Sequence, residues 1–361
     1  MLTKGDDYPI HQTSEPVAVS GTDRNFYDRY FFNGQTADGS LFFAAAMGIY
    51  PHLNIIDAAF SVLHAGKQRS VFASRILHSE RMDTQVAPIA VEVIEPLHKL
   101  CLTVGANDSG IEADLFFTGR APPIEEPRFI RRIGPRTLMD VTRLTQGGVW
   151  SGTVTLDGVR HDVTGSFGTR DRSWGVRPIG APDAQPPAPM PVPQFYWLWA
   201  PLNFDDHLLF FHTNDEADGT PWNRSALLVP LDGSPPVKLA SPAASLIFKP
   251  GTRHAVSATL EGGGVRVDLA VGPTFVMHGI GYGHPTRAHG TFHGEHSVHS
   301  EAHDVTSLDE GILANNHIQA LVSATLTLPD GSTRQGRGVL EQLIVGPHAP
   351  SGFAGLFDLA P

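Results

Sequence analysis

The chain has 361 residues, of which 41% are hydrophobic, 17% are charged, 37 are glycine and 29 are proline. This length allows two domains or one large β domain, and the glycine and proline content favours many short strands over long helices. The formal net charge of -11 argues against nucleic acid as a partner, because a phosphate backbone is bound by clustered Lys and Arg.

The first residues contain no apolar signal segment, and the chain has no run of about 18 apolar residues that could span a membrane. We therefore expect a cytoplasmic protein without a membrane span. The single cysteine, Cys101, excludes an internal disulfide and a cysteine-based zinc site. It alternates with its neighbours as a core residue of a strand does.

In chain order, segments of strand length recur between turn signals, among them residues 40–50, 54–63, 99–106, 111–119, 150–168, 194–202, 207–213, 225–233, 244–249, 254–271, 318–331 and 338–346. Hairpin turns are indicated at Asp157-Gly158, Asp232-Gly233, Gly262-Gly263 and Asp330-Gly331. No segment keeps a 3.6-residue apolar period, so helices should be few and short, with one candidate over residues 125–144. The pattern predicts an all-β protein of antiparallel strands.

Residues 180–194, GAPDAQPPAPMPVPQ, are too rich in proline for a central strand and divide the chain almost in half. Each half ends in a Thr-rich strand, an Asp-Gly turn and a returning strand. In each, a further glycine follows the turn glycine by seven residues, Gly165 after Gly158 and Gly338 after Gly331. We therefore predict two tandem β-barrels, residues 1–180 and 195–361, joined by a linker of residues 181–194.

Residues 168–175, GTRDRSWG, place one carboxylate, two arginines and a tryptophan between glycines. Strand alternation places Asp171 on the apolar face and directs Arg170, Arg172 and Trp174 outward or along the barrel wall. Burial raises the pKa of a carboxyl group and a neighbouring arginine lowers it, so Arg170 or Arg172 would set the charge of Asp171. The alternative is a salt-bridge network that closes one barrel end without catalysing anything.

Residues 277–304 contain seven of the 18 histidines of the chain. No HExxH or facial-triad spacing defines a ligand set there, so we predict no metal site, although a histidine-rich segment can bind metal by composition alone. His284 and His289, beside Tyr282 and Glu295, could instead donate or accept protons near neutral pH. Ordinary surface or core histidines are the alternative.

Asp57 interrupts an apolar strand that follows Tyr50, and a lone acid there needs a hydrogen-bond partner or a function. Pairing with an arginine such as Arg75 is the structural alternative. Farther along the chain, three aromatic residues suit the wall of a hydrophobic ligand cavity, although a barrel core is the more frequent place for them: Tyr196, Trp197 and Trp199. The motifs GxGxxG, GxxxxGK[ST], GxSxG and CxxC are absent, which argues against a nucleotide cofactor and a serine hydrolase.

Four of these segments together resemble the tandem lipocalin-like superfamily that includes carotenoid hydratases (hydroxyneurosporene synthase) and kievitone hydratase: residues 30–75, GTRDRSWG, QFYWLW and GYGHPTRAHGTFHGE. The resemblance covers most of the chain. It implies two tandem lipocalin-like antiparallel barrels, a ligand cavity within or between them, and cofactor-independent acid/base chemistry on an apolar alkene, polyene or polyphenol. The carotenoid hydratases lack part of this pattern, so we expect a sister family with different chemistry.

We therefore expect a cofactor-independent lyase or isomerase of the hydratase or cyclase type, acting on a hydrophobic terpenoid, steroid or aromatic natural product. Asp171 would be the principal acid or base, with Asp57 in reserve and Tyr282, His284 and His289 completing proton transfer. The remaining expected substrate contacts are Tyr50, Trp174, Tyr196, Trp197, Trp199 and Glu295. The alternatives are a non-catalytic carrier of an apolar molecule and a His-ligated metalloenzyme.

Overall fold

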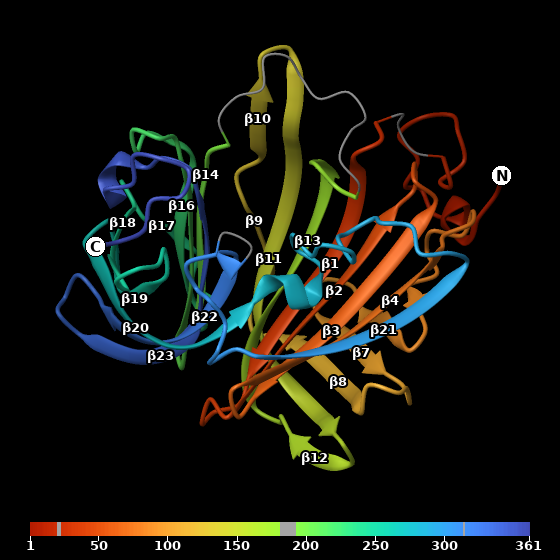
Figure 1. Cartoon of the computed structure of the whole chain (residues 1–361), viewed down its shortest axis with the longest axis horizontal. Helices are drawn as coiled ribbons and strands as arrows, with labels where there is room; N and C mark the ends of the chain where they lie inside the picture. The colour runs from red at the N-terminus through yellow and green to blue at the C-terminus, as the bar shows by residue number, and fades with distance from the viewer. Residues whose placement is uncertain (20–22, 181–192, 313–314) are drawn as a thin grey trace.

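The computed structural model describes residues 1–19, 23–180, 193–312 and 315–361, and it consists of two curled antiparallel β-sheets (Figure 1). The expected all-β class is confirmed, with each sheet forming a half-barrel. The helices in the described ranges are short 3-10 turns, η1 (Lys4–Asp7), η2 (Met277–Ile280) and η4 (Ala349–Ser351). None of the helices in these ranges is long and apolar enough to cross a membrane.

The first sheet has 14 strands and contains almost all of the first half of the chain. Along its main path the order is β21 (His296–Asp304), β4 (Lys67–Ile76), β3 (Ile55–His64), β2 (Leu41–Tyr50), β1 (Phe26–Gln35), β13 (Ser166–Val176), β11 (Arg136–Leu156), β8 (Ile111–Gly119), β7 (Lys99–Val104), β6 (Ile89–Glu95) and β5 (Gln85–Val86). Three more strands pair with β11: β9 (Ile124–Glu125), β10 (Phe129–Ile133) and β12 (Val159–Asp162).

The second sheet has nine strands, all from the second half of the chain. Their order is β17 (Val237–Lys238), β16 (Pro221–Pro230), β15 (His207–Asp215), β14 (Phe195–Phe204), β23 (Thr333–Val345), β22 (Ile318–Thr327), β20 (Val265–Val276), β19 (Ala255–Gly262) and β18 (Ala243–Phe248). One strand of the second half of the chain, β21, does not belong to this sheet but pairs with β4 at the edge of the first sheet. Residues 181–192 of the expected linker lie outside the described residues, so the domain boundaries stay a prediction.

Two local predictions have different outcomes. The expected turns lie between paired strands: Asp157-Gly158 closes the two-residue hairpin of β11 and β12, and Gly263-Gly264, one residue later than expected, joins β19 to β20. The candidate helix over residues 125–144 is wrong, because this segment forms β9, β10 and the first part of β11. Val141, Arg143 and Thr145 alternate along this segment and face the same side of the sheet. The pairing of β11 with β13 therefore makes the segment a strand and not a helix.

Three large apolar clusters and one small one hold the described part of the fold together. One lies inside the first sheet around Phe43, Phe60 and Trp150, and a second lies inside the other sheet around Leu198 and Leu340. The third joins strands of both sheets and contains Phe31, Phe42, Ala59, Trp197, Trp199, Phe275 and Leu321. The outer faces of β1–β3 and of β14, β22 and β23 are therefore buried against each other. Cys101, as expected, is a buried residue of β7.

The two sheets present equivalent strands to each other. β13 lies between β1 and β11, and β23 lies between β14 and β22. Gly168 and Gly338 occupy matching places in these strands, where a Cβ atom would lie about 2 Å from a carbonyl oxygen of the neighbouring strand. Three residues after each glycine comes an acid, Asp171 in β13 and Glu341 in β23. This internal correspondence supports a tandem arrangement of two related sheets.

Candidate functional site

Asp171 lies on the face of β13 that is turned toward the second sheet. Its cross-strand neighbour on β1 is Phe31, whose ring meets the edge of Trp199 from β14 with the centroids 6.0 Å apart. The strand alternation assumed from Val159 is interrupted at residues 163–165 between β12 and β13. Asp171 is nevertheless buried, with 8% of its surface exposed, and it faces the space between the sheets.

The environment of Asp171 keeps its carboxyl group poised between its two protonation states. Burial is the largest influence and raises its pKa to about 6, while the positive charges of Arg143 and Arg29 oppose this rise. Glu126 and Glu341 raise it further because they are negative. No residue in the described ranges donates a hydrogen bond to the Asp171 carboxylate. Asp171 is thus a buried acid with its hydrogen-bonding capacity unused.

The two arginines beside Asp171 in the sequence are not the largest positive influences on its pKa. Arg170 lies on the opposite face of β13, where its Nε donates to Gln146 Oε1 at 2.7 Å and its guanidinium faces the Phe117 ring. It is 3% exposed, so of the two directions expected for it, outward or along the barrel wall, the outward one is wrong. Arg172 pairs with Asp28 at 2.8 Å and stacks on Tyr30. The role expected of them falls to Arg29 and Arg143 instead.

Arg29 of β1 is a buried cation to which no described residue offers a hydrogen-bond acceptor. It is 1% exposed, and its Nε, Nη1 and Nη2 atoms are all buried and unpaired. Its guanidinium carbon lies 4.2 Å from the centre of the Tyr282 ring. Because an aromatic face replaces only part of the hydration of a guanidinium, three free donors at such a depth indicate that an acceptor from solvent or a ligand belongs there.

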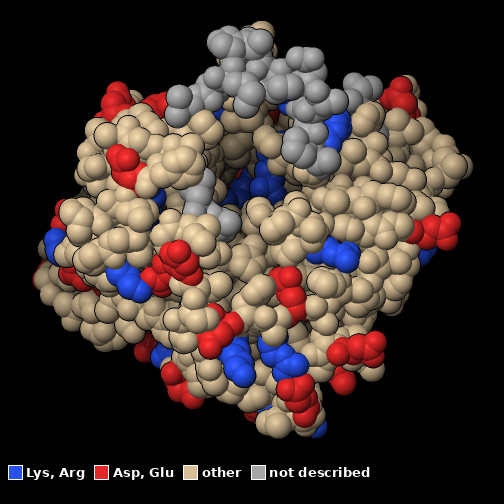
Figure 2. Space-filling model, in the orientation of Figure 1, with Lys and Arg blue, Asp and Glu red and all other residues tan. Residues whose placement is uncertain are grey.

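A cleft of about 410 Å³ reaches this region, and Arg177, Tyr282 and His289 are among the residues that line it. Figure 2 shows this face of the molecule hollowed near its middle, with Lys or Arg side chains inside the hollow. Arg177 lies over the rings of Tyr27 and Tyr282 at 4.6 and 5.4 Å, and its Nε has no hydrogen-bond partner among the residues that the structure describes. Its pKa is raised because the nearby tyrosines and Asp171 outweigh burial, so it stays charged.

Arg143 is neutralised by a different acid, the buried Glu126. Its Nε donates to Glu126 at 2.8 Å, and Thr145 Oγ1 donates to the other carboxylate oxygen at 2.6 Å. Burial alone would raise the pKa of Glu126, but Arg143, His212 and these hydrogen bonds lower it below its ordinary value. The guanidinium of Arg143 also faces the rings of Trp197 and Trp199, at 4.8 and 5.5 Å.

Glu341 is held in the same way from the second sheet. Trp197 Nε1 and His317 Nε2 lie 2.9 Å from its Oε1, and Gln319 Nε2 donates to its Oε2 at 2.7 Å. These partners, with the His317 charge, lower its pKa against the effect of burial. Among these three buried acids, Glu126 and Glu341 are therefore held in the ionised carboxylate form, whereas Asp171 is not.

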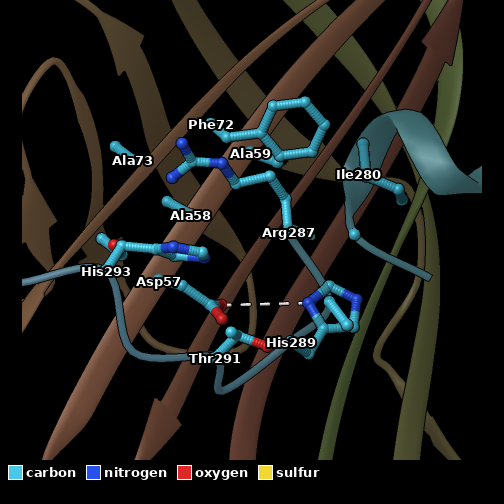
Figure 3. Close-up of a pocket in the computed structure, with 13 residues that line it drawn as sticks. Asp57, Ala58, Ala59, Phe72, Ala73, Ile280, Arg287, His289, Thr291 and His293 are labelled. Carbon is cyan, nitrogen blue, oxygen red and sulfur yellow. Dashed lines mark ion pairs between the residues drawn. The ribbon is translucent and has the colours of Figure 1, made fainter. Parts of the chain in front are cut away.

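Asp57 forms a second group with Tyr50 and His289, and Figure 3 shows Asp57 beside His289. Tyr50 donates its hydroxyl to Asp57 Oδ1 at 3.1 Å, Gly290 donates its N–H to Oδ2 at 2.6 Å, and His289 Nδ1 lies 3.9 Å from Oδ1. Burial, followed by the charge of Arg29, lowers the pKa of His289 to about 3, so this imidazole is neutral at pH 7. Arg75 pairs instead with Asp83 at 3.1 Å, so the alternative partner expected for Asp57 is not used.

The structure brings some of the expected residues together and separates others. Asp171, Tyr282, His289, Trp197 and Trp199 lie around the interface between the sheets, and Asp57 and Tyr50 lie beside His289. Four others lie elsewhere. Tyr196 of the second sheet stacks on His348, Trp174 is 37% exposed, Glu295 is exposed just before β21, and His284 contacts Glu301.

Several residues of the site were not expected from the sequence, namely Arg29, Arg143, Arg177, Glu126, Glu341 and His317. Arg29 carried a usable signal, because it alternates with Tyr27 and Phe31 as the lone charge on an apolar strand face. The same reasoning singled out Asp57. Arg143 and Glu126 fell in the segment taken for a helix, and Glu341 becomes significant only when the two sheets face each other.

Residues 2–354 match the family described as "Family of unknown function (DUF8625)". No curated protein matches the chain. The fold is similar to that of a Nitrosomonas europaea protein provisionally assigned as AttH, with a TM-score of 0.55, 14% identity and coverage of 93% of this chain and 98% of that chain. It is also similar to kievitone hydratase from Nectria haematococca, with a TM-score of 0.53, 12% identity and coverage of 91% and 92%. At these identities the similarity shows the fold alone, an antiparallel β architecture with two half-barrel sheets in one chain.

Proposed function

We propose that this chain, which belongs to the family of unknown function DUF8625, is a cofactor-independent acid/base enzyme. Its reaction would be that of a lyase or isomerase of the hydratase or cyclase type, on a hydrophobic terpenoid, steroid or aromatic natural product. The observation that carries the proposal is Asp171, a buried carboxyl group with a pKa of about 6 and with none of the described residues donating a hydrogen bond to it. A structural acid is normally satisfied by fixed partners, as Glu126 and Glu341 are.

A carboxyl group with this pKa can serve in either direction near pH 7. A general acid or base works best when its pKa lies close to the working pH, since both protonation states are then accessible. Asp171 would remove a proton from the substrate or deliver one to it. The cleft lined by Tyr282 and His289 would admit the substrate, and Trp197 and Trp199 would contribute apolar walls.

The charges around Asp171 favour an anionic intermediate over a carbocation. Arg29 and Arg177 form no ion pair with any described acid, and both lie over the Tyr282 ring. The faces of Trp197 and Trp199 are already turned to the guanidinium of Arg143, so they are poorly placed to shield a second cation. Buried, preorganised donors stabilise charge that develops on an oxygen atom. We therefore infer that the substrate carries a carbonyl or phenol oxygen that binds Arg29 and gains negative charge when Asp171 takes a carbon-bound proton.

Exchange of substrate hydrogen with solvent tests this function without knowledge of the product. The purified protein would be incubated in D₂O with a panel of enones, phenols and polyketide-like ketones, and deuterium at carbon would be followed by NMR and mass spectrometry. We expect incorporation with at least one compound class, and a loss of about 100-fold or more in Asp171→Asn, in line with general acid/base contributions. The matched control is Asp114→Asn, an exposed aspartate of β8. Full exchange by folded Asp171→Asn would refute the assignment.

The carrier alternative is supported by the same unpaired Arg29, because a non-catalytic protein could use it to bind an anionic ligand. It predicts tight binding of a carboxylate or phenolate without deuterium incorporation or turnover. Native mass spectrometry of the protein purified from cells, followed by incubation of any released molecule with fresh protein, separates the two functions. An unchanged ligand after long incubation would favour the carrier.

A further inference from the structure

A cluster of histidine and glutamate side chains lies on the first sheet, away from Asp171. The alternation of β21 places Glu301 and His303 on its half-buried face, and η2 brings His278 next to them. His303 Nε2 lies 3.1 Å from Glu301 Oε1, and His278 Nδ1 lies 4.0 Å from the same oxygen. One donor atom from each residue lies within 4.8 Å of the other two. The cluster thus joins two segments that are separated in the sequence by the loop after η2.

Two ligand atoms of this cluster are buried without a well-directed hydrogen bond. Glu301 Oε1 and His303 Nε2 form a close ion pair at 3.1 Å, but neither has a hydrogen bond of good geometry to any residue that the structure describes. At this distance the missing bond reflects an unfavourable direction of the N–H and lone-pair axes. Buried polar atoms normally have hydrogen-bond partners. A carboxylate oxygen and an imidazole nitrogen that lie close together without a good hydrogen bond therefore indicate that a ligand is missing between them.

We propose that His278, Glu301 and His303 bind a single zinc ion. Imidazole and carboxylate are zinc ligands at about 2.0–2.2 Å, and tetrahedral geometry then places neighbouring ligand atoms about 3.3 Å apart. The distances in the cluster reach this arrangement with side-chain shifts of the order of 1 Å. Two imidazoles disfavour magnesium and calcium, which prefer oxygen ligands. The His303 side chain is 34% exposed, so water can complete the coordination.

His284 would act as an outer partner that orients Glu301. Its Nε2 lies 3.1 Å from Glu301 Oε2, while its Nδ1 accepts the backbone N–H groups of Thr286 and Arg287 at 3.1 and 2.8 Å. These two acceptor contacts require the proton to be on Nε2, so His284 donates to Glu301 and leaves Oε1 free for the ion. Such second-layer hydrogen bonds are typical of metal-binding carboxylates.

The zinc site would stabilise the loop that serves the interface between the sheets. The ion would connect η2 to β21, and residues 281–295 between them carry Tyr282 and His289. This site is separate from Asp171, and the inference stands or falls independently of the proposed enzymatic function. It also differs from a His-ligated catalytic metal, because the substrate cleft is lined by other residues.

Zinc binding would be measured on the full chain without a polyhistidine tag, after treatment with a chelator and dialysis. Calorimetry with ZnCl₂ should give one ion per chain, and cobalt(II) should give the visible absorption of a four-coordinate site with nitrogen and oxygen ligands. We expect His303→Ala and Glu301→Gln each to weaken zinc binding by about 10-fold or more. His299→Ala is the matched control, since His299 lies on the same face of β21 but outside the cluster.

Thermal unfolding with and without zinc distinguishes loss of zinc binding from misfolding of a variant. The wild-type midpoint should rise with zinc, because an ion that binds only the folded state stabilises it. The His278→Ala/His303→Ala variant should unfold cooperatively but show no zinc-dependent shift. Absence of stoichiometric zinc binding in the wild type would overturn the proposal. Equal loss of affinity in His299→Ala and His303→Ala would overturn it as well, because binding would then be due to histidine content alone.

Discussion

The guanidinium of Arg29 lies 4.2 Å from the centre of the Tyr282 ring, so the first strand of the first sheet is held against the loop that follows η2. Tyr282 is shared by several partners. Arg177 lies 5.4 Å from the same ring, and the rings of His289 and His317 meet it edge-on at 4.9 and 4.7 Å. One aromatic side chain thus links both sheets with the histidine-rich segment, and its ring is the feature to test first.

Replacement of Tyr282 by leucine should destabilise the protein, whereas replacement by phenylalanine should have little effect. A desolvated cation over an aromatic face is worth about 2 kcal/mol, and leucine removes this interaction while phenylalanine retains it. Urea unfolding followed by tryptophan fluorescence would measure both variants. Equal stability of Tyr282→Leu and Tyr282→Phe would show that the ring contributes only apolar contact.

Asp171 should make the folded protein less stable as the pH rises from 4 to 8. Its pKa is raised from 3.8 to about 6 on folding, so its stabilising contribution is present below pH 4 and is lost as the pH rises through 6. A shift of about two units corresponds to about 3 kcal/mol. The free energy of unfolding of Asp171→Asn, relative to that of the wild type, should therefore rise by up to this amount between pH 4 and pH 8. A difference that does not change with pH would show that Asp171 titrates normally.

The charge of Arg29 should hold down the pKa of two groups at once. It lowers the pKa of Asp171 and also that of His289. In Arg29→Met, both values should rise, and Asp171 should titrate above pH 6. Carboxyl carbon shifts of protein labelled at aspartate would follow Asp171, with Asp171→Asn identifying its signal. Arg170→Met provides the matched comparison, since Arg170 is equally buried but lies on the other face of β13, and its charge influences the pKa of Asp171 less than that of Arg29 does. An unchanged titration in Arg29→Met would mean that its charge is screened from Asp171.

The fold and part of the site could be predicted from the sequence because both depend on local pattern. The strands β2, β3 and β14 are short apolar runs that are buried on both faces, and the Asp157-Gly158 turn follows from its own chemistry. Asp171 and Asp57 were found as acids on apolar strand faces. The partners of these acids were not, because Arg143 and Glu341 come near Asp171 only through the pairing of β11 with β13 and the contact between the sheets.

The pairing of β21 with β4 shows a further limit of prediction from local sequence pattern. Its sequence alternates polar and small residues with no apolar face, and five of its nine residues are exposed. Nothing in that alternation distinguishes a strand of the second sheet from one added to the edge of the first. The position of β21 is decided by long-range pairing, from His296 opposite Arg75 to Asp304 opposite Lys67.

Gln319 should be a sensitive point of the contact between the sheets. Asn33 Nδ2 donates to its Oε1 at 3.1 Å, and its Nε2 donates to Glu341 Oε2 at 2.7 Å, so it connects β1 to β23 in a fully buried position. Gln319→Met would leave the Asn33 amide and one Glu341 oxygen unsatisfied, at a cost of about 1–3 kcal/mol for each group.

The stability deficit of the same variant should depend on pH. The hydrogen bond from Gln319 helps to lower the pKa of Glu341, and a lowered carboxyl pKa stabilises the folded state above the unfolded pKa and loses that effect as the pH falls. In Gln319→Met the pKa of Glu341 should rise, because the lost hydrogen bond stabilised the charged form. Urea unfolding at pH 5 and pH 7.5 should therefore show a smaller deficit relative to the wild type at the lower pH, where protonation of Glu341 makes the missing hydrogen bond matter less. Gln335→Met on the exposed part of β23 should change stability by less than about 0.5 kcal/mol at either pH. An equally small effect of Gln319→Met would show that the two sheets are held together by their apolar contacts alone.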